Sequence, residues 1–429
     1  MTRGAGSAGQ RGSSLSPAAQ CAACALVGWS LAGWACRPAA PPPAPVTAPA
    51  PVSAGAEWAH SSGSQGTLAT EPLPPIQLTF IDDFNPPRPE ASSSTAAPAA
   101  AWDVALGGLS GLHYVERERR LYAVSDDGKR YAPRLYTFQV ELGPQHLRVV
   151  PERVVLLREA SPSGLLQEID AEAITGDGER LFLSLEGHAE RALQHESRVL
   201  TLRPDGLITG SVAVPDAFLP AAAGQPARGT RSNEGFEGLA LSPGARFLWA
   251  ISEAPLEQDG PWASCEQGAR LRLCRWDLSS APAAQHAPQT YFYPTEPIAP
   301  RPSAGAPCTG VNGVSELVAI DERRLLVLER SYVAPNPEEH GRNVVRIFEV
   351  EVPEAPVAGA PVLLSKRLLL DLDEVVPRFD VGQRSLDNFE GMTLGPPTPS
   401  GARSLLLVAD DNFSRSQRMV FLAFELRGG

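Results

Sequence analysis

Short runs of apolar residues, bounded by turn residues, recur along the chain from Ile76 onwards. Runs of four to six residues rich in Leu, Val, Ile, Ala and aromatic side chains are typical of buried β-strands rather than helices. The runs group into five units with one plan: an apolar strand, a turn, a second strand ending in an acidic residue, a polar loop, and a third strand that usually opens with a basic residue. This pattern predicts an all-β protein built from repeats.

The five units begin at residues 108, 170, 235, 313 and 388, with GLSGLHY, DAEAIT, GFEGLAL, GVSELVA and NFEGMTL. A fourth strand follows most units, but the last unit runs out of chain near Gly429, and IQLTFIDDF (Ile76 to Phe84) is a strand left over at the start. We therefore predict a β-propeller of five four-stranded blades, closed by pairing of N- and C-terminal strands so that no sheet edge is exposed. A sixth, degenerate blade in the connection 279–309 is the alternative.

The front of the chain does not follow the repeat. Arg3 and Arg11 precede an apolar stretch, and small residues stand before Cys36, so residues 1–35 are predicted to be a signal peptide. Residues 36–75 are rich in proline and alanine and have few side chains large enough to build a core, which predicts a tether. The folded domain is accordingly expected to span 76–429.

The stretch LAGWAC resembles a bacterial lipobox, whose cysteine receives lipid and anchors the protein. Trp34 and the absence of leucine at the third position before Cys36 depart from that pattern, so lipidation of Cys36 and plain secretion both stay open. In either case the protein is expected to be exported, to the periplasm or the cell envelope, and membrane anchoring would depend on the lipid on Cys36. An outer-membrane lipoprotein is one form this could take.

The net charge and the cysteines bear on the ligands that the protein could bind and on its disulfides. The net charge of -12 argues against a nucleic-acid binder, because neutralising phosphates needs a basic face. The folded part contains Cys265, Cys274 and Cys308. In an oxidising compartment one disulfide is expected among them, most simply between Cys265 and Cys274. The alternative is that all three are unpaired buried thiols. No CxxC pair in this part supports a zinc site.

Laying the units over one another places charged residues in three columns. The first holds Ser110, Glu172, Glu237, Glu316 and Glu390; the second holds Asp126, Glu186, Glu253, Glu329 and Asp410; the third holds Arg134, Arg198, Arg270, Asn343 (or Arg342) and Arg418. The first strand of a propeller blade lines the central channel, so the first column predicts an acidic ring around the axis. Either the arginines neutralise the carboxylates within each blade, or the ring binds a hard cation such as Ca²⁺; the two interpretations are compatible.

Several ordered motifs carry a family resemblance. GLSGLHY followed by LYAVSDDG, then EIDAEAIT, NEGFEGLALSP with LWAISE, and DNFEGMTL with LLLVADDN resemble the phytase-like propeller family, described as having esterase-like activity of the phytase type. The resemblance covers about residues 76–426 and implies a propeller fold and an exported bacterial protein. True propeller phytases, to which the likeness is distant, depend on calcium, hold the metal with acidic clusters and hold phosphate with basic residues.

The resemblance and the columns together predict a metal-assisted hydrolase of small phosphoric or other esters. Ca²⁺ would be held by Glu172, Glu237, Glu316 and Glu390, and phosphate oxygens by Arg134, Arg198, Arg270 and Arg418. No catalytic residue is assigned.

The sequence is also compatible with two other functions. In a serine esterase, Ser110 would be the nucleophile with His113 or His188 as base, but GLSGL lacks the spacing of GxSxG and the column is otherwise filled by glutamate. A non-enzymatic, envelope-anchored propeller would instead bind a ligand or protein on its long loops, with Trp262 and Tyr332 as aromatic contacts.

Overall fold

The computed structural model describes residues 75–87, 106–126, 132–160, 169–187, 196–221, 225–279, 287–299, 308–334, 341–353, 361–375, 386–414 and 416–428. The chain divides into two compact units, Met1–Pro72 and Leu73–Gly429. The predicted signal peptide, Cys36 and the tether as far as residue 74 lie outside the described residues. Within the described residues no helix is long and apolar enough to cross a membrane.

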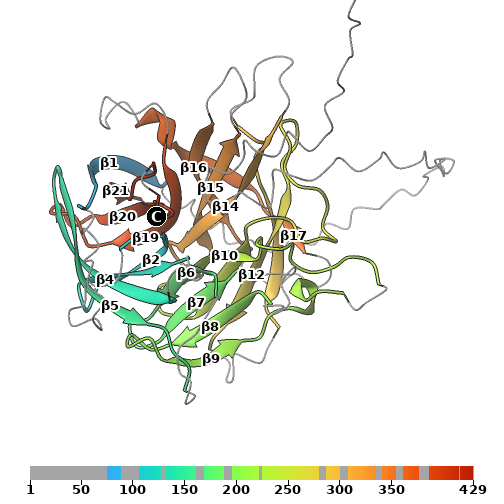
Figure 1. The fold of residues 1–429 in the computed structure, drawn as a ribbon. Helices are drawn as coiled ribbons and strands as arrows, with labels where there is room; N and C mark the ends of the chain where they lie inside the picture. The colour runs from blue at the N-terminus through green and yellow to red at the C-terminus, as the bar shows by residue number, and fades with distance from the viewer. Residues whose placement is uncertain are drawn as a thin grey trace, which may run out of the picture. The chain divides into compact units, whose positions relative to one another are not determined.

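Five sheets form the second unit, and each is one of the predicted blades (Figure 1). Blade 1 contains β2 (Leu109–Val115), β3 (Arg120–Ser125), β4 (Arg134–Gly143) and β5 (His146–Leu156), and blade 2 contains β6 (Ala171–Gly176), β7 (Leu181–Leu185), β8 (Arg198–Leu202) and β9 (Ile208–Val212). Blade 3 contains β10 (Phe236–Leu241), β11 (Phe247–Ser252), β12 (Arg270–Asp277) and β13 (Gln289–Pro294), and blade 4 contains β14 (Gly310–Ala319), β15 (Arg324–Val333), β16 (Arg342–Glu351) and β18 (Lys366–Asp371). Blade 5 contains β19 (Asn388–Gly395), β20 (Arg403–Asp410), β21 (Phe421–Arg427) and β1 (Gln77–Phe84). Short 3-10 turns, η4 (Asp216–Phe218) and η6 (Leu372–Glu374), follow β9 and β18.

The terminal strands close the propeller. β1 pairs antiparallel with β21, from Gln77 opposite Arg427 to Phe84 opposite Phe421. The innermost strands β2, β6, β10, β14 and β19 contact one another in turn around the axis. Five blades with closure by the N- and C-terminal strands are therefore confirmed.

One strand departs from the predicted plan. The segment VLLSKRLLLDL was expected to be a single fourth strand of blade 4, but it is split. β17 (Val362–Leu363) pairs parallel with β13 of blade 3, and only β18 joins β16 of blade 4. The connection from blade 4 therefore extends the outer edge of blade 3 before returning.

Apolar side chains from adjacent blades fill the spaces between sheets. Trp249 and Tyr291 of blade 3 pack with Leu325 and Val327 of blade 4, and all four are fully buried. Burial of side chains of this size is worth about 1.5–3 kcal/mol each. This packing between blades holds the inner strands in fixed positions around the channel.

Each innermost strand has a register shift at the same place. It lies between Leu109 and Leu112, Ala171 and Ile174, Phe236 and Gly238, Val314 and Glu316, and Phe389 and Gly391. A β-bulge redirects a side chain and bends the strand locally. The shift lies near the start of β2, β6, β10 and β19 and inside β14, and it determines how the residue at the bulge faces the channel.

Glycines next to the bulges let the inner strands approach closely. A Cβ atom at Gly238 would lie 2.9 Å from the Leu317 nitrogen, and one at Gly391 would lie 2.7 Å from the Ser110 carbonyl oxygen. Any larger residue would push neighbouring blades apart. The repeated Glu-Gly pair thus combines a carboxylate with the small residue that brings the blades together at the axis.

The predicted disulfide between Cys265 and Cys274 is wrong. Cys265 is bonded to Cys308, which is 43 residues away in sequence. Cys274 is a buried free thiol in the middle of β12, where it packs against Phe236 and Trp276. Its place inside a strand keeps it in the blade core, whereas Cys265 lies in the loop before that strand.

Removal of this disulfide is expected to destabilise the protein substantially. In the chain-entropy model, a cross-link that closes a loop of this length lowers the entropy of the unfolded chain and so raises the free energy of unfolding by about 4 kcal/mol. Urea unfolding of a Cys265→Ser, Cys308→Ser double variant should show a loss of that order. Dithiothreitol should lower the wild-type midpoint to the same value and leave the double variant unchanged; equal midpoints for all samples would contradict the prediction.

Candidate metal centre

Strand register corrects the acidic columns in blade 4. Val314 lies opposite Glu329, as Phe236 lies opposite Ser252 and Phe389 opposite Ala409. Ser315 therefore occupies the position of Glu237 and Glu390, and Glu316 occupies that of the following glycines. The same register places Arg330, opposite Gly313, at the position of Glu253 and Asp410.

The two acids that the sequence placed in these columns have other roles. Glu316 Oε1 accepts hydrogen bonds from the backbone N–H groups of Leu239 and Leu317, each at 2.9 Å, and so joins β10 to β14. Its other oxygen has no hydrogen-bond partner among the described residues. Glu329 accepts from the Tyr293 hydroxyl at 2.6 Å and pairs with Lys366. Glu316 is thus outside the carboxylate groups described next.

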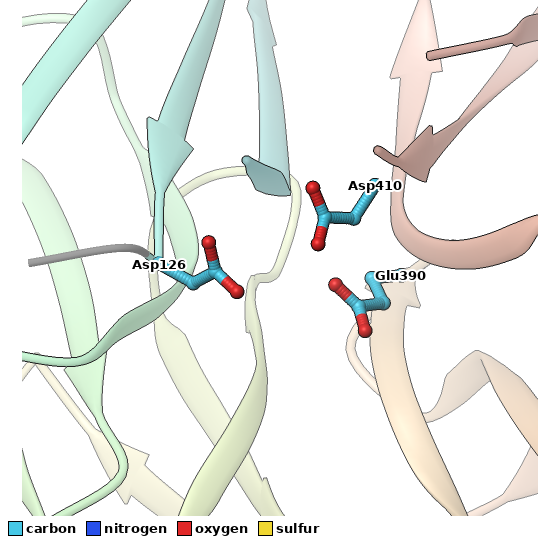
Figure 2. A group of neighbouring side chains, drawn as sticks. All are labelled: Asp126, Glu390 and Asp410. Carbon is cyan, nitrogen blue, oxygen red and sulfur yellow. The ribbon is translucent and has the colours of Figure 1, made fainter. Parts of the chain in front are cut away.

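Carboxylates from four blades gather at this end of the channel. Three groups each contain oxygens within 4.8 Å of one another: Asp126 with Glu390 and Asp410; Asp170 with Glu172 and Glu186; and Glu186 with Glu237 and Glu253. Figure 2 shows the first group, in which Asp126 of blade 1 points toward Glu390 and Asp410 of blade 5 across a shared space. We call these residues, with Arg330, the acidic ring.

Burial makes this concentration of charge costly. The pKa values of Glu172, Glu186 and Glu237 are raised well above the ordinary value for glutamate. Burial is the largest cause, and the charges of neighbouring carboxylates add to it. The pKa of Asp410 is also raised well above its ordinary value, first by burial and then by the charges of Asp126 and Glu390. Burial raises the pKa of Glu390 to about 7 even though Arg330 opposes the shift. Without added positive charge, the ring cannot be fully ionised at neutral pH.

Unsatisfied oxygens show that the ring fits a cation. Glu237 Oε2, Glu390 Oε2 and Asp410 Oδ2 are buried and have no hydrogen-bond partner in the described part of the chain. A buried polar atom without a partner costs free energy, and the cost is larger for a charged group. An all-oxygen set of carboxylates is what Ca²⁺ and other hard divalent cations prefer, whereas zinc favours nitrogen and sulfur.

Hydrogen bonds orient the ring residues. Asn388 Nδ2 donates to Glu390 Oε1 at 2.7 Å, and the backbone N–H of Asn412 donates to Asp410 Oδ1 at 2.9 Å. In both carboxylates the opposite oxygen is the unpartnered one. Outer contacts of this kind fix a metal ligand and leave its second oxygen for the ion.

The arginines predicted to bind substrate lie farther out. Arg134, Arg198 and Arg270 begin third strands, and Arg418 lies three residues before the third strand of blade 5. Third strands are two strand spacings, or about 10 Å, from the innermost strand. Arg134 is fully buried, donates to the Tyr136 hydroxyl at 2.5 Å and stacks over Phe413. Arg418 pairs with Asp387, while Arg198 and Arg270 are exposed. The third column therefore does not form part of the ring.

The geometry does not favour a serine nucleophile. Ser110 Oγ donates to Glu172 Oε2 at 2.8 Å. His113 lies three residues farther along β2, about 10 Å away, where burial lowers its pKa to about 4 and it bonds to the backbone of Gly176. It lines a cavity of about 450 Å³ at the other end of the inner strands. His188 lies outside the described residues.

The aromatic residues expected on a binding face are partly covered. The Arg231 guanidinium lies 4.9 Å from the centre of the Trp262 ring. Tyr332 belongs to β15 and is half-buried. Neither forms an exposed aromatic patch.

Comparison with known proteins identifies a family. The family model described as "Phytase-like: Esterase-like activity of phytase" matches residues 104–413. Among solved structures, an endo-arabinase from Bacteroides thetaiotaomicron VPI-5482 aligns at 9% identity and a TM-score of 0.39, covering 74% of this chain and 93% of that one. A gluconolactonase from Xanthomonas campestris aligns at 11% identity and a TM-score of 0.30, covering 82% and 99%. Similarity at this level carries no inference about chemistry, and a search among curated proteins finds no match.

Proposed function

Because the chain belongs to the phytase-like family, we propose that it is a metal-assisted hydrolase of phosphoric esters whose cation is held by the acidic ring. The observation that supports this most directly is the set of buried carboxylate oxygens that converge from neighbouring blades and have no hydrogen-bond partner among the described residues. A site of this composition attracts cations and repels anionic substrates until it is loaded. Cation binding would therefore precede substrate binding.

Two parts of the ring would hold the cation. One consists of Asp126, Glu390 and Asp410, and the other of Asp170, Glu172, Glu186, Glu237 and Glu253. Calcium is the expected ion because it takes six to eight oxygens in flexible geometry. A bound divalent cation supplies Lewis-acid polarisation of an ester oxygen.

The chain's own residues would prepare the site. Asn388 and the Asn412 amide hold Glu390 and Asp410 in position, and Ser110 holds Glu172 by its 2.8 Å hydrogen bond. Of the four arginines predicted to bind phosphate, Arg198 and Arg270 are exposed and open to an approaching anion. Arg134 and Arg418 are committed to protein contacts.

Release of phosphate, and separately of carboxylic acid, should be measured from a panel of monoesters that includes inositol phosphates, with purified residues 37–429. We expect phosphate release in Ca²⁺ and none in EDTA. The matched control is the same assay with Mg²⁺, which demands a tighter octahedral geometry and is expected to support less turnover. A folded protein that hydrolyses neither ester class would contradict the proposal and favour a non-enzymatic binding propeller.

A further inference from the structure

Arg330 is the exception in the acidic ring. It extends from β15, is only 8% exposed, and occupies the position that a carboxylate takes in the other four blades. Its Nη2 lies 3.4 Å from Glu390 and 3.7 Å from Glu253, and its Nε donates to Ser315 Oγ at 3.3 Å. It therefore stands between the two parts of the ring, in contact with a carboxylate of each.

These contacts are long for a buried guanidinium. Charge-assisted N–H···O bonds are usually about 2.7–2.9 Å. Arg272, on the outer part of blade 3, shows the tight form, with two bonds of 2.6 and 2.7 Å to Asp259. Arg330 is thus held by the charge around it rather than by a two-pronged bond to one carboxylate.

Blade 4 departs from the repeat in both columns at once. Where blades 2, 3 and 5 have a glutamate on the inner strand, it has Ser315, and where all the others have an acid on the second strand, it has Arg330. A glutamate at 315 would lie beside the guanidinium and bind it. Serine leaves the guanidinium available and supplies only one weak contact.

We propose that Arg330 is an anion-binding residue of this site: it is a counter-charge for Glu253 and Glu390 in the metal-free ring, and it binds phosphoryl oxygens of the substrate once cations occupy those carboxylates. The inference rests on the proposed function, because it requires a cation in the ring. Cations on both sides would remove the attraction that holds the guanidinium and add positive charge around it. An anion with several oxygens, such as a phosphomonoester dianion, then becomes its best partner, since the planar guanidinium matches phosphate oxygens in pairs.

Binding of phenylphosphonate, a phosphomonoester mimic that is not hydrolysed, tests the inference without turnover. Calorimetric titration at saturating Ca²⁺ should show that Arg330→Gln binds phenylphosphonate at least about tenfold more weakly than wild type, the scale expected for one lost charge-assisted pair. Its affinity for Ca²⁺ should be unchanged or higher, because a positive charge has left the ring. Arg330→Lys should fall between the two, as it keeps the charge without the paired geometry.

Two further variants test whether an effect on phenylphosphonate binding is specific to Arg330. Arg346→Gln removes a guanidinium from the same blade that pairs with Asp371 outside the ring, and it should bind phenylphosphonate like wild type. Ser315→Glu keeps Arg330 but supplies a carboxylate to bind it, and it should weaken phosphonate binding as Arg330→Gln does. If Arg330→Gln does not fold, Arg330→Lys and Ser315→Glu still decide the question.

The outcomes separate this inference from the proposed function. Equal phenylphosphonate affinity in wild type, Arg330→Gln and Ser315→Glu would overturn the role of Arg330, whatever the turnover. Ca²⁺-dependent phosphonate binding that is lost in Arg330→Gln, with no ester hydrolysed, would support Arg330 and reject the hydrolase. Absence of Ca²⁺ binding by the wild-type protein would reject both.

Discussion

Replacement of Glu390 by glutamine together with Asp410 by asparagine is expected to lower Ca²⁺ affinity on the order of a hundredfold and to abolish Ca²⁺-dependent turnover. Both residues belong to one carboxylate group with Asp126, and each contributes a buried oxygen without a hydrogen-bond partner in the described residues. The amides keep the shape of the side chains but remove two negative charges. Affinity in an oxygen site depends strongly on the number of charged ligands.

The same double variant should be more stable than wild type when metal is absent. Burial and like charges raise the pKa of both carboxyl groups, which means that the fold disfavours their ionised forms at neutral pH. Neutral amides remove that penalty, so the melting temperature in EDTA should rise while the stabilisation by Ca²⁺ falls. Opposite changes in the two conditions are not expected from a simple packing defect.

Glu316→Gln is the matched control for this experiment. Glu316 is buried and has an unpartnered oxygen, but its other oxygen accepts two backbone hydrogen bonds and it stands outside the three carboxylate groups. Its substitution should change Ca²⁺ affinity little, by less than about threefold. If the double variant binds Ca²⁺ like wild type and only melts at lower temperature, the ring is a structural feature and the site assignment is wrong.

The sequence predicted the blades well because apolar strands and turns are local signals. Each unit could be delimited from runs such as LWAISE and LLLVADD, and the surplus strand at Ile76 indicated how the propeller closes. The predicted strands correspond to those of the structure in all five blades, except for the last strand of blade 4. The split of the segment after Val362 could not be foreseen, since it depends on which sheet edge lies nearest.

The acidic site was only partly predictable, because its geometry depends on register. Aligning the motif GVSELVA by its glutamate placed Glu316 in the ring, whereas the bulge in β14 places Ser315 there. The same one-residue shift placed Glu329 in the second column, at the position that Arg330 occupies in the structure. A signal was present: Gly313-Val314-Ser315 aligns with Gly235-Phe236-Glu237 when glycine and the apolar residue are matched first.

The distance of the arginines from the channel could not be read from the sequence either, and their role in substrate binding stays a prediction. Residues that are close within a repeat unit need not be close to the channel, because each strand adds about 4.8 Å from the axis. Arginines on third strands therefore reach neighbouring blades or solvent more readily than the channel. The pairing of Cys265 with Cys308 shows the same limit, because residues from different blades meet there and no local pattern records it.

Stability of the metal-free protein is expected to fall as pH rises from about 5 to about 8. Several ring carboxyl groups, Glu390 and Asp410 among them, have folded-state pKa values above their unfolded ones, so the folded state binds more protons between the two values. The resulting stabilisation is full below the unfolded value of 4.5 and is lost as pH passes the folded value, which is about 7 for Glu390. For Glu390 alone this amounts to about 3 kcal/mol, and Glu172, Glu186, Glu237 and Asp410 shift in the same direction.

Thermal unfolding in EDTA at several pH values between 5 and 8 measures this dependence, and the same series in Ca²⁺ shows whether the cation reverses it. Ca²⁺ needs ionised carboxylates, so its stabilising effect should be small at pH 5 and largest at pH 8, opposite to the trend without metal. The Glu390→Gln, Asp410→Asn variant should show a flatter pH profile in EDTA because two of the titrating groups are gone. A metal-free melting temperature that rises between pH 5 and pH 8 would mean that partners within the protein already neutralise the ring carboxylates, and the basis for a cation site would be lost.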